Sequence, residues 1–524
     1  MKNYITLVYF VLMFVFATGC TSNTEKEAPK PNILLAIADD VSYPHMGAYG
    51  CSWVSTPAFD KIAEQGVLFN NAYTPNAKCA PSRACILTGR NSWQLEEACN
   101  HMPYFPIKFK SFPEALADNG YHVGYTGKGW VPGVAYHEDG SKRDLLVNAY
   151  RKIKTTPPTT EISVDDYSEN FKSFLSDNKE NKPFFFWYGG WEPHRAYEYA
   201  SGLKYGKKLA EIDKVFDFWP DNDSVRTDML DYAFELEYFD KQLQKILTTL
   251  EEKDMLDNTI VIVTADNGMP FPRIKGQEYE MSNHLPLTIM WKDGIKHVGR
   301  SVDDFVKFTD IAPTLLELCG ITNEESGMKP FYGMSLTDII LSNKSGKVNP
   351  ERDHVLIGKE RHDIGRPNNQ GYPIRGIRKG DFLYLRNFKT DRWPVGNPET
   401  GYLNCDGSPT KTVCLETKGT KMDYIWQLNF NKRTDEELYN VSEDPFCMKN
   451  LAEEEKYAAI KAQMSEQMIN ELTEQEDPRI LGNGDVFDSY KVYPPKLMNY
   501  YERYTNGEET PTLHWVNNSD YQNQ

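Results

Sequence analysis

The residues best suited to chemistry in this sequence begin at Cys79, in the run Cys79-Ala-Pro-Ser-Arg83. We expect this run to start a helix, where free backbone N–H groups and the helix dipole favour negative charge. Arg83, one turn further on, adds a fixed positive charge. The combination predicts a nucleophile directed at an anion. The plainer alternative is a small buried core cysteine, the most common environment of a free cysteine.

Two pairs of oxygen-bearing side chains predict a metal site. Asp39 and Asp40 follow the apolar run that ends at Ala38, and Asp266 and Asn267 follow a second apolar run. Hard cations such as Ca²⁺ and Mg²⁺ prefer oxygen ligands, whereas zinc usually draws in histidine or cysteine. A single pair of this kind is more often a helix cap or a turn. Two such pairs, each behind a buried strand, favour the metal site.

Lys128 and His194 complete the set of reactive candidates. Lys128 stands between two glycines at the end of a short apolar run, and His194 lies in Glu-Pro-His-Arg after another. A fixed ammonium group can hold an anionic substrate, and a histidine can donate a proton to a departing atom. A solvated loop lysine and a structural histidine are the plainer alternatives. Their positions after predicted strands favour roles in the site.

These residues need a scaffold that gathers strand ends, and the hydrophobic pattern predicts one. Apolar runs predict strands buried on both faces, and stretches of helical periodicity between them predict helices. Their alternation is typical of an α/β fold, in which binding sites lie beyond the carboxyl ends of the strands. The predicted strands cover 32–38, 121–126, 183–188 and 259–264, and predicted helices begin at Thr56, Ser111, Asp223 and Thr309.

The pattern changes to shorter segments after about residue 345. A hairpin, a further strand and an amphipathic helix are typical of a smaller α+β domain packed on the first. We therefore expect a catalytic domain over residues 31–350 and a C-terminal domain over residues 351–524. The predicted hairpin covers 372–388, the strand begins at Glu437, and the helix covers 453–473.

The composition limits the classes of partner. The chain has 524 residues, with 58 Lys and Arg against 75 Asp and Glu, and a formal charge of −17. Nucleic-acid binding selects basic surfaces, so a nucleic-acid partner is excluded. The same charge disfavours wrapping a long polyanion. An anionic substrate must therefore bind locally, in a pocket where a few basic side chains outweigh the overall field.

The N-terminal residues predict a targeting segment outside the fold. A short basic start precedes the apolar run Ile5–Phe16, which is too short for a comfortable membrane span. The run leads into Ala-Thr-Gly-Cys20, which resembles a bacterial lipobox and implies cleavage before Cys20 and a lipid on its thiol. We expect a signal peptide over 1–19 and a flexible tether over 20–30. The product would be an exported lipoprotein in the periplasm or at the outer membrane, and an ordinary secretory signal without lipid is the alternative.

Nine cysteines are present, and Cys405 and Cys414 are the best candidates for a disulfide. They flank a loop that contains glycine and proline, and the expected compartment is oxidising. No Cys-x-x-Cys pair with zinc spacing is present.

The stretch from Cys79 to Arg90 carries a family resemblance. It matches C-x-P-S-R-x-x-x-L-T-G-R at every fixed position and resembles the signature of the type I, formylglycine-dependent sulfatases. The resemblance implies an alkaline-phosphatase-like sandwich with a large mixed, mostly parallel sheet, and a smaller C-terminal α+β domain with an antiparallel sheet. It also implies that a formylglycine-generating enzyme converts Cys79 to formylglycine (3-oxoalanine), whose hydrated aldehyde attacks the sulfate sulfur.

The same resemblance gives roles to the other candidates. One calcium ion, rather than magnesium, would be held by four side chains and an oxygen of the modified Cys79. Two fixed charges would hold the hydrated aldehyde and the sulfate oxygens. A histidine would donate a proton to the leaving group, and a lysine would contact the sulfate. The metal ligands would be Asp39, Asp40, Asp266 and Asn267, the fixed charges Arg83 and Lys128, and the last pair His194 and Lys275.

One position departs from the family pattern. Sulfatases commonly place a histidine two residues after the position of Lys128, where it helps to break down the sulfated intermediate. This chain has Trp130 there. Three alternatives are open: His137 replaces the missing histidine by coming close in space, His101 does so, or the step proceeds without a histidine.

Weaker matches favour a saccharide substrate. The runs Asp266–Pro272 and Gly371–Arg375 look closest to the heparan N-sulfatase (N-sulfoglucosamine sulfohydrolase) branch. Ordinary polar surface is an equal alternative for the residues that would contact sugar hydroxyls or carboxylates. These candidate contacts are Glu360, Arg361, His362 and Arg375.

The sequence therefore predicts a calcium-dependent sulfatase that releases sulfate from a sulfated saccharide, with O-sulfate and N-sulfate both open. A phosphatase or phosphodiesterase of the same superfold is one alternative, although such enzymes normally use serine or threonine directly. A non-catalytic glycan-binding lipoprotein is the other, although it would have no need of Cys79, Arg83, Lys128 and the metal ligands together.

Overall fold

The structure, a computed structural model, describes residues 29–522. The predicted signal peptide, Cys20 and most of the predicted tether lie outside the described residues. Across residues 29–522, no helix is long and apolar enough to cross a bilayer. Residues from Pro31 onward cluster as one compact unit.

Across residues 29–522 the strands form three sheets, of eight, four and three strands. The large sheet is mixed and mostly parallel, as predicted, because β9 runs antiparallel to both of its neighbours. Its spatial order is β10 (Arg300–Val302), β2 (Val67–Tyr73), β9 (His284–Met290), β8 (Thr259–Ala265), β1 (Asn32–Ala38), β7 (Phe184–Gly189) and β4 (His122–Gly127), with β11 (Val306–Lys307) beside β2.

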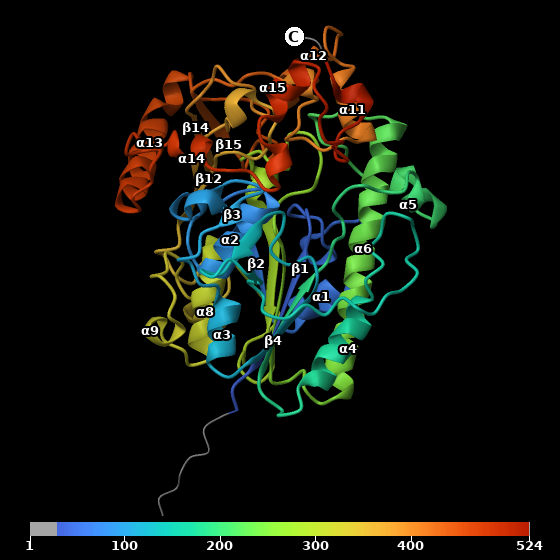
Figure 1. The fold of residues 1–524 in the computed structure, drawn as a ribbon, viewed down its shortest axis with the longest axis vertical. Helices are drawn as coiled ribbons and strands as arrows, with labels where there is room; N and C mark the ends of the chain where they lie inside the picture. The colour runs from blue at the N-terminus through green and yellow to red at the C-terminus, as the bar shows by residue number, and fades with distance from the viewer. Residues whose placement is uncertain (1–28, 523–524) are drawn as a thin grey trace, which may run out of the picture. The chain divides into compact units, whose positions relative to one another are not determined.

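Helices cover both faces of the large sheet, which makes a three-layer sandwich (Figure 1). Alternate residues of β1 point to opposite faces, as the pleat requires. Leu34 and Ala36 pack into one hydrophobic cluster, and Ile33 and Leu35 pack into the other. The first face is covered by α1 (Pro57–Glu64), α4 (Tyr167–Asp177) and α6 (Asp223–Glu252), and the second by α2 (Cys79–Thr88), α3 (Phe112–Asp118) and α8 (Ile311–Leu318).

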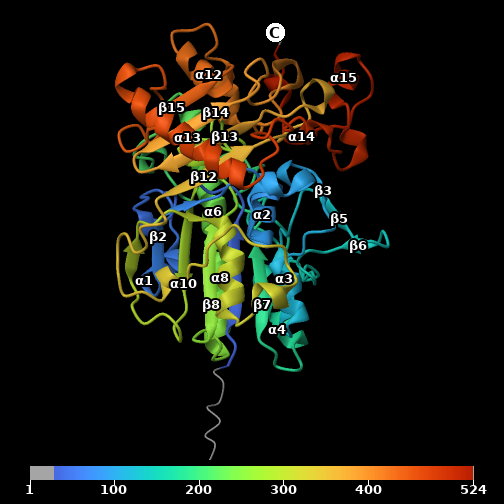
Figure 2. The same cartoon turned by 90° about the vertical axis from the view of Figure 1, so that its left-hand side faces the viewer.

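The C-terminal part forms the predicted antiparallel sheet, above the upper edge of the large sheet in Figure 2. The described strands of the large sheet all precede residue 350, and those of the antiparallel sheet all follow it. The antiparallel order is β12 (His354–Lys359), β13 (Ile374–Lys379), β14 (Phe382–Asn387) and β15 (Glu436–Asn440); the third, small sheet is β3 (Tyr104–Phe105), β5 (Val134–Tyr136) and β6 (Lys142–Arg143).

Short helices complete the C-terminal part. They include α11 (Pro409–Leu415), α12 (Asp423–Phe430), α13 (Ala458–Glu474) and α15 (Tyr500–Thr505).

The predicted disulfide between Cys405 and Cys414 is wrong. Both are free, buried thiols in the same hydrophobic cluster. The segment between them is not an open loop, because Ser408 caps the short helix α11 by accepting a hydrogen bond from the Lys411 N–H at 3.0 Å. The two sulfurs therefore serve as small apolar packing groups.

The start of α1 is held by a carboxylate from another helix. The backbone N–H groups of Ala58 and Phe59 each donate to the carboxylate of Asp240 on α6, at 2.9 Å. The side chain of Thr56, the residue before the helix, makes no capping bond of its own. Burial raises the pKa of the Asp240 carboxyl to about 7, although these two hydrogen bonds oppose the shift.

We expect this carboxyl to make stability depend on pH. Its folded-state pKa is raised, so its contribution is complete at acid pH and is lost as pH rises through about 7. Between about pH 5 and pH 8, the unfolding free energy of both proteins should fall. The fall should be smaller in Asp240→Asn, and the difference between the two falls should reach up to about 3 kcal/mol. Urea unfolding at both pH values measures this, with the exposed Asp391→Asn as the matched control. Equal pH dependence in wild type and Asp240→Asn would contradict the assignment.

Candidate active site

The site residues meet because neighbouring parallel strands end at the same level. Ala38 of β1 pairs with Ala265 of β8, so Asp39 and Asp266 follow side by side. The Asp266 N–H donates to the carbonyl of Ala38 at 3.3 Å, and the Asp40 N–H donates to Oδ1 of Asp266 at 3.1 Å. Asp40 has a positive φ of 73°, a conformation that costs energy for a residue with a side chain.

Lys128 reaches the same place through a glycine. Gly127, the last residue of β4, has φ of +68°, and a Cβ added there would lie 2.0 Å from the carbonyl oxygen of Gly189 on β7. The Lys128 N–H donates to that same oxygen at 2.7 Å. This close approach places the Lys128 ammonium in a buried ion pair with Asp39.

Cys79 is the first residue of α2 and lies against the carboxylates, as the sequence predicts. Its Sγ is 3.6 Å from Oδ1 of Asp39 and 3.9 Å from Oδ1 of Asp40. Burial raises the pKa of the Cys79 thiol, and the lowering effect of Lys128 does not overcome it. The thiol is therefore protonated at neutral pH, and a protonated thiol is a poor nucleophile.

Arg83, one turn further along α2, is fully buried and bonds mainly to the protein. Its Nε donates to Asp266 at 2.8 Å, and its Nη1 donates to the carbonyls of Lys128 and Gly129 at 3.0 and 3.1 Å. Its Nη2 has no hydrogen-bond partner and lies 3.8 Å from Asp39. Arg83 thus fixes the Asp266 carboxylate and leaves one N–H group for an anion.

The oxygen ligands fit a hard cation. Carboxylate oxygens of Asp39, Asp40 and Asp266 lie within 4.8 Å of one another. The amide nitrogen of Asn267 donates to Asp40 at 2.7 Å, and its buried Oδ1 has no partner. Burial and the Asp39 charge raise the pKa of Asp266. Three converging carboxylates and an unpartnered amide oxygen form the all-oxygen donor set that calcium or magnesium prefers.

Lys275 and His194 border this group from the other side. The Lys275 ammonium pairs with Asp40 at 2.7 Å and with Asp406 at 2.9 Å. Nε2 of His194 lies 3.9 Å from Asp40, and Nδ1 of His194 contacts the Arg195 carbonyl at 2.5 Å. Because a carbonyl only accepts hydrogen bonds, Nδ1 carries a proton.

Sequence reasoning missed Asp406 and Lys78. Burial alone would raise the pKa of Asp406, but the nearby Lys275 and Lys78 ammonium groups hold it well below the usual range. Burial, followed by the like charge of Lys275, lowers the pKa of Lys78. Asp406 lies in an irregular segment of the C-terminal part, where no local pattern points to a site. Lys78 had one usable signal, its position directly before Cys79.

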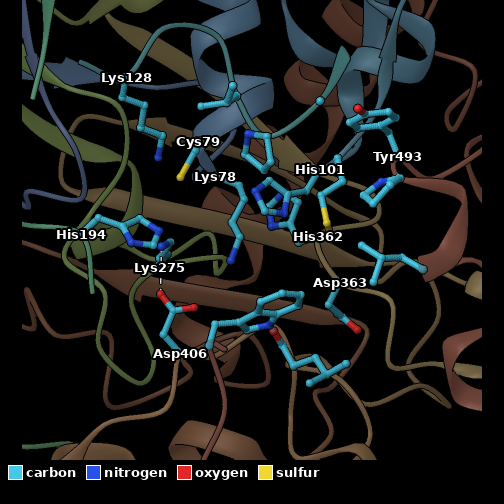
Figure 3. A pocket seen from close by; sticks show the side chains of 18 of the residues that line it. Lys78, Cys79, His101, Lys128, His194, Lys275, His362, Asp363, Asp406 and Tyr493 are labelled. Carbon is cyan, nitrogen blue, oxygen red and sulfur yellow. Dashed lines mark hydrogen bonds and ion pairs between the residues drawn. The ribbon is translucent and has the colours of Figure 1, made fainter. Parts of the chain in front are cut away.

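A cavity of about 530 Å³ opens onto these groups (Figure 3), within the usual size of small-molecule sites. Its floor carries Lys78, Cys79, Lys128, His194 and Lys275. Its wall is mostly apolar, and several of its side chains come from the C-terminal part. These are Leu403, Tyr493, Pro494, Leu497 and Trp515, and the first part of the chain adds Met102 and Trp191.

The two histidines proposed to replace the one missing at position 130 differ in location. His101 lines the cavity, and both of its ring nitrogens are buried and find no hydrogen-bond partner within residues 29–522. His137 is exposed in the turn between β5 and β6, outside the cavity lining. Trp130 donates from Nε1 to the Ala80 carbonyl at 3.0 Å and braces the start of α2. His101 alone of the two is placed to act at the site.

Of the four predicted sugar contacts, only His362 lines the cavity. Glu360 and Arg375 form a buried ion pair at 2.9 Å, which Asp477 and Arg479 extend at 2.7 and 2.6 Å. Arg361 is buried, and its guanidinium donates to backbone carbonyls. These three residues are structural groups behind the cavity wall, because their charged ends are consumed by protein partners.

Comparisons with known proteins agree with the geometry. The family model described as Sulfatase matches residues 31–321. An ulvan-active sulfatase of Formosa agariphila is 28% identical over 457 residues, which are 86% of this chain and 81% of that protein. The N-sulphoglucosamine sulphohydrolase of Homo sapiens is 25% identical over 491 residues, which are 87% and 93% of the two chains.

The fold has solved counterparts. A structure described as a complex with its substrate D-glucosamine-2-N,6-O-disulfate matches with a TM-score of 0.60 at 19% identity, over 86% of this chain and 98% of the other. The predicted alkaline-phosphatase-like α/β class is confirmed.

We expect Gly127→Ala to disrupt the approach of β4 to β7. The left-handed backbone costs about 1–2 kcal/mol for alanine, and the overlap with the Gly189 carbonyl adds to that. The matched control is Gly140→Ala, because Gly140 has φ of +83° and open space around its Cβ position. Urea unfolding should show a clearly larger loss of stability for Gly127→Ala. Equal losses would mean that the close approach to Gly189 is unimportant.

Proposed function

The chain belongs to the sulfatase family and is a sulfuric ester hydrolase, and on that premise we propose a calcium-dependent enzyme that carries formylglycine at position 79 and acts on sulfated saccharides. The observation that carries this proposal is the contact of the Cys79 side chain with Asp39 and Asp40. This contact places the cysteine of the sulfatase signature directly against two of the proposed calcium ligands.

The two absent groups would supply the nucleophile and the charge compensation. Asp39, Asp40, Asp266 and Asn267 would hold the calcium ion, which would polarise the sulfate. Formylglycine would supply, as its hydrate, one hydroxyl to attack the sulfur and a second to expel the sulfate as the aldehyde re-forms. One water would then rehydrate the aldehyde, so that the overall reaction is a hydrolysis. The unpartnered Oδ1 of Asn267 and the protonated thiol of Cys79 support both assignments.

The chain's own charges would orient the sulfate. Lys128 and Lys275 reach the cavity floor from opposite sides of Cys79, and each is held by a carboxylate. Fixed donors of this kind stabilise charge that develops at the transition state without reorganising. The free Nη2 of Arg83 is buried behind them and can stabilise the residue at position 79.

His194 would protonate the leaving atom. Its Nδ1 proton is used by the Arg195 carbonyl, so the proton it gives away must be on Nε2, the nitrogen that faces Asp40. The acid is therefore the imidazolium form, in which both ring nitrogens carry a proton. His101 is the candidate base for the second step, because both of its ring nitrogens are free.

A sulfated saccharide fits the cavity and the relatives. Aromatic side chains such as Trp191, Tyr493 and Trp515 offer apolar faces, and the lysines of the floor offer positive charge. The printed names of the relatives include an ulvan-active sulfatase and an N-sulphoglucosamine sulphohydrolase. We leave O-sulfate and N-sulfate open, and we propose export with a lipid on Cys20 from the sequence pattern alone.

Phosphate-ester hydrolysis is the rival activity on the same fold. Such enzymes normally use serine or threonine directly, and Cys79 argues against this activity here. Parallel measurement of sulfate and phosphate release from matched esters separates the two.

We expect mass spectrometry to find formylglycine at position 79. In protein produced with a formylglycine-generating enzyme, the tryptic peptide Cys79–Arg83 should lose H₂S and gain oxygen. Cys85, in the adjacent tryptic peptide and buried in the same helix, is the internal control and should keep its thiol. Cys79→Ala should abolish sulfate release. Full activity with an unmodified Cys79 thiol would contradict the mechanism.

We also expect calcium to stabilise the protein. At about a hundredfold excess over the dissociation constant, a bound ion adds about 2.7 kcal/mol to the unfolding free energy. Thermal unfolding with calcium and with a chelator measures this, together with sulfate release. Asn267→Ala should weaken calcium binding about tenfold or more without changing the charge, and the exposed Asn343→Ala is its control. An unchanged calcium affinity in Asn267→Ala would place the ion elsewhere.

A further inference from the structure

Lys78 is a buried ammonium group that no carboxylate of residues 29–522 contacts directly, although the charge of Asp406 is near enough to interact with it. It is 3% exposed and lines the cavity beside Cys79 (Figure 3). Among residues 29–522 its Nζ makes no ion pair and no hydrogen bond, whereas Lys128 and Lys275, on the same floor, are each paired with a carboxylate. Burying an unpaired charge is costly, so such a group is usually kept for a ligand.

The proposed reaction has enough positive charge without Lys78. Three cationic side chains face four carboxylates around Cys79. A divalent cation and the His194 imidazolium would leave two positive charges over, and the single negative charge of a sulfate ester would neutralise one of them. Asp363, the remaining acid of the cavity, is already paired with Arg366 at 2.5 Å. The Lys78 charge is therefore surplus to sulfate binding. The cationic side chains are Arg83, Lys128 and Lys275, and the carboxylates are Asp39, Asp40, Asp266 and Asp406.

His362 adds an acceptor of fixed direction to the cavity. Its Nε2 lies 2.6 Å from Oδ1 of Asn76, whose amide nitrogen donates to Ser92 and to the carbonyl of Cys99, both at 3.2 Å. Since Asn76 Oδ1 accepts, the proton of His362 is on Nε2. Among residues 29–522, its Nδ1 is then a buried lone pair that makes no hydrogen bond, although the ring also lies near the Gly276 carbonyl. That atom needs a donor such as a hydroxyl group.

We propose that Lys78 and His362 recognise a second anionic group on the sulfated saccharide and a hydroxyl beside it. The anion would accept from the Lys78 ammonium, and the hydroxyl would donate to Nδ1 of His362. This inference rests on the proposed function, because it places both anions in one cavity. A sugar carboxylate and a second sulfate share the required chemistry, and the experiment separates them.

The test compares substrates that differ only in the second anion. A sulfated neutral hexose, the matching sulfated hexuronic acid and the matching disulfated hexose are hydrolysed by wild type, Lys78→Met and Lys78→Arg. For Lys78→Met, the preference in kcat/KM for a doubly anionic substrate over the neutral hexose should fall about ten- to a hundredfold, mainly through KM. Lys78→Arg should keep much of the preference.

The control for overall charge is Lys491→Met. Lys491 is exposed, lies two residues before Tyr493 of the cavity wall and is outside the lining. Its loss removes the same charge and should leave the preference unchanged. The enzyme's preference in kcat/KM for one of the two doubly anionic substrates should depend on Lys78. That substrate identifies the second anion as carboxylate or sulfate.

Binding without turnover gives a second readout. In the Cys79→Ala background, calorimetry with the same three saccharides should show tighter binding of a doubly anionic one, and Lys78→Met should remove the difference. Far-UV circular dichroism checks that each variant is folded. If wild type releases no sulfate from any ester, the proposed function fails, while this binding comparison still tests Lys78.

Two outcomes would overturn the inference. A wild type with no preference for either doubly anionic sugar would leave Lys78 without the proposed ligand. Equal losses of kcat on all three substrates in Lys78→Met would assign Lys78 to the transferred sulfate, or to keeping His101 active as a base, rather than to a second anion.

Discussion

The structure depends on holding like charges together at the ends of β1 and β8. The carboxylates of Asp39, Asp40 and Asp266 converge within 4.8 Å in a buried place, where their mutual repulsion is poorly screened. The fold pairs them with Lys128, Lys275 and Arg83, each from a different segment. Asp406 shares Lys275 with Asp40, so that four carboxylates face these three cations, and a bound cation would relieve the remaining negative charge. Much of the local geometry follows from this constraint.

The scaffold meets the constraint with a few backbone features. The parallel register of β1 and β8 places Asp39 and Asp266 side by side, and the left-handed backbone at Asp40 turns the next carboxylate inward. Gly127 allows β4 to approach β7 closely enough to deliver Lys128. The start of α2 then brings Cys79 against the acids. Large helices and sheet layers on either side supply the rigidity that such strained positions need.

The sequence was sufficient to predict elements and site residues where a local pattern of apolar residues marks them. The buried strands β1 and β8 follow from unbroken apolar runs, and the helix α6 follows from helical periodicity. The residues after the two strands were predicted to lie close together, and Asp40 does contact Asp266. The sequence was insufficient where partners lie far apart. Asp406 lies in an irregular segment and pairs with Lys275, 131 residues away in the sequence. Glu360 and Arg375 form buried ion pairs with Arg479 and Asp477 of a distant segment, so that neither charge is left for a sugar. No local pattern reports these pairings.

Chemistry and recognition are drawn from different parts of the chain. Most of the groups proposed to act on the sulfate lie between residues 39 and 275, on strand ends whose positions are fixed by the large sheet. Much of the cavity wall comes from residues 362–515, on loops and short helices. Loops tolerate substitution far better than buried parallel strands do. Changes in the wall can therefore alter which saccharide fits without disturbing the balanced charges beneath it. Lys78 and Asp406 are exceptions, since each faces the cavity while its charge is felt by the reactive cluster.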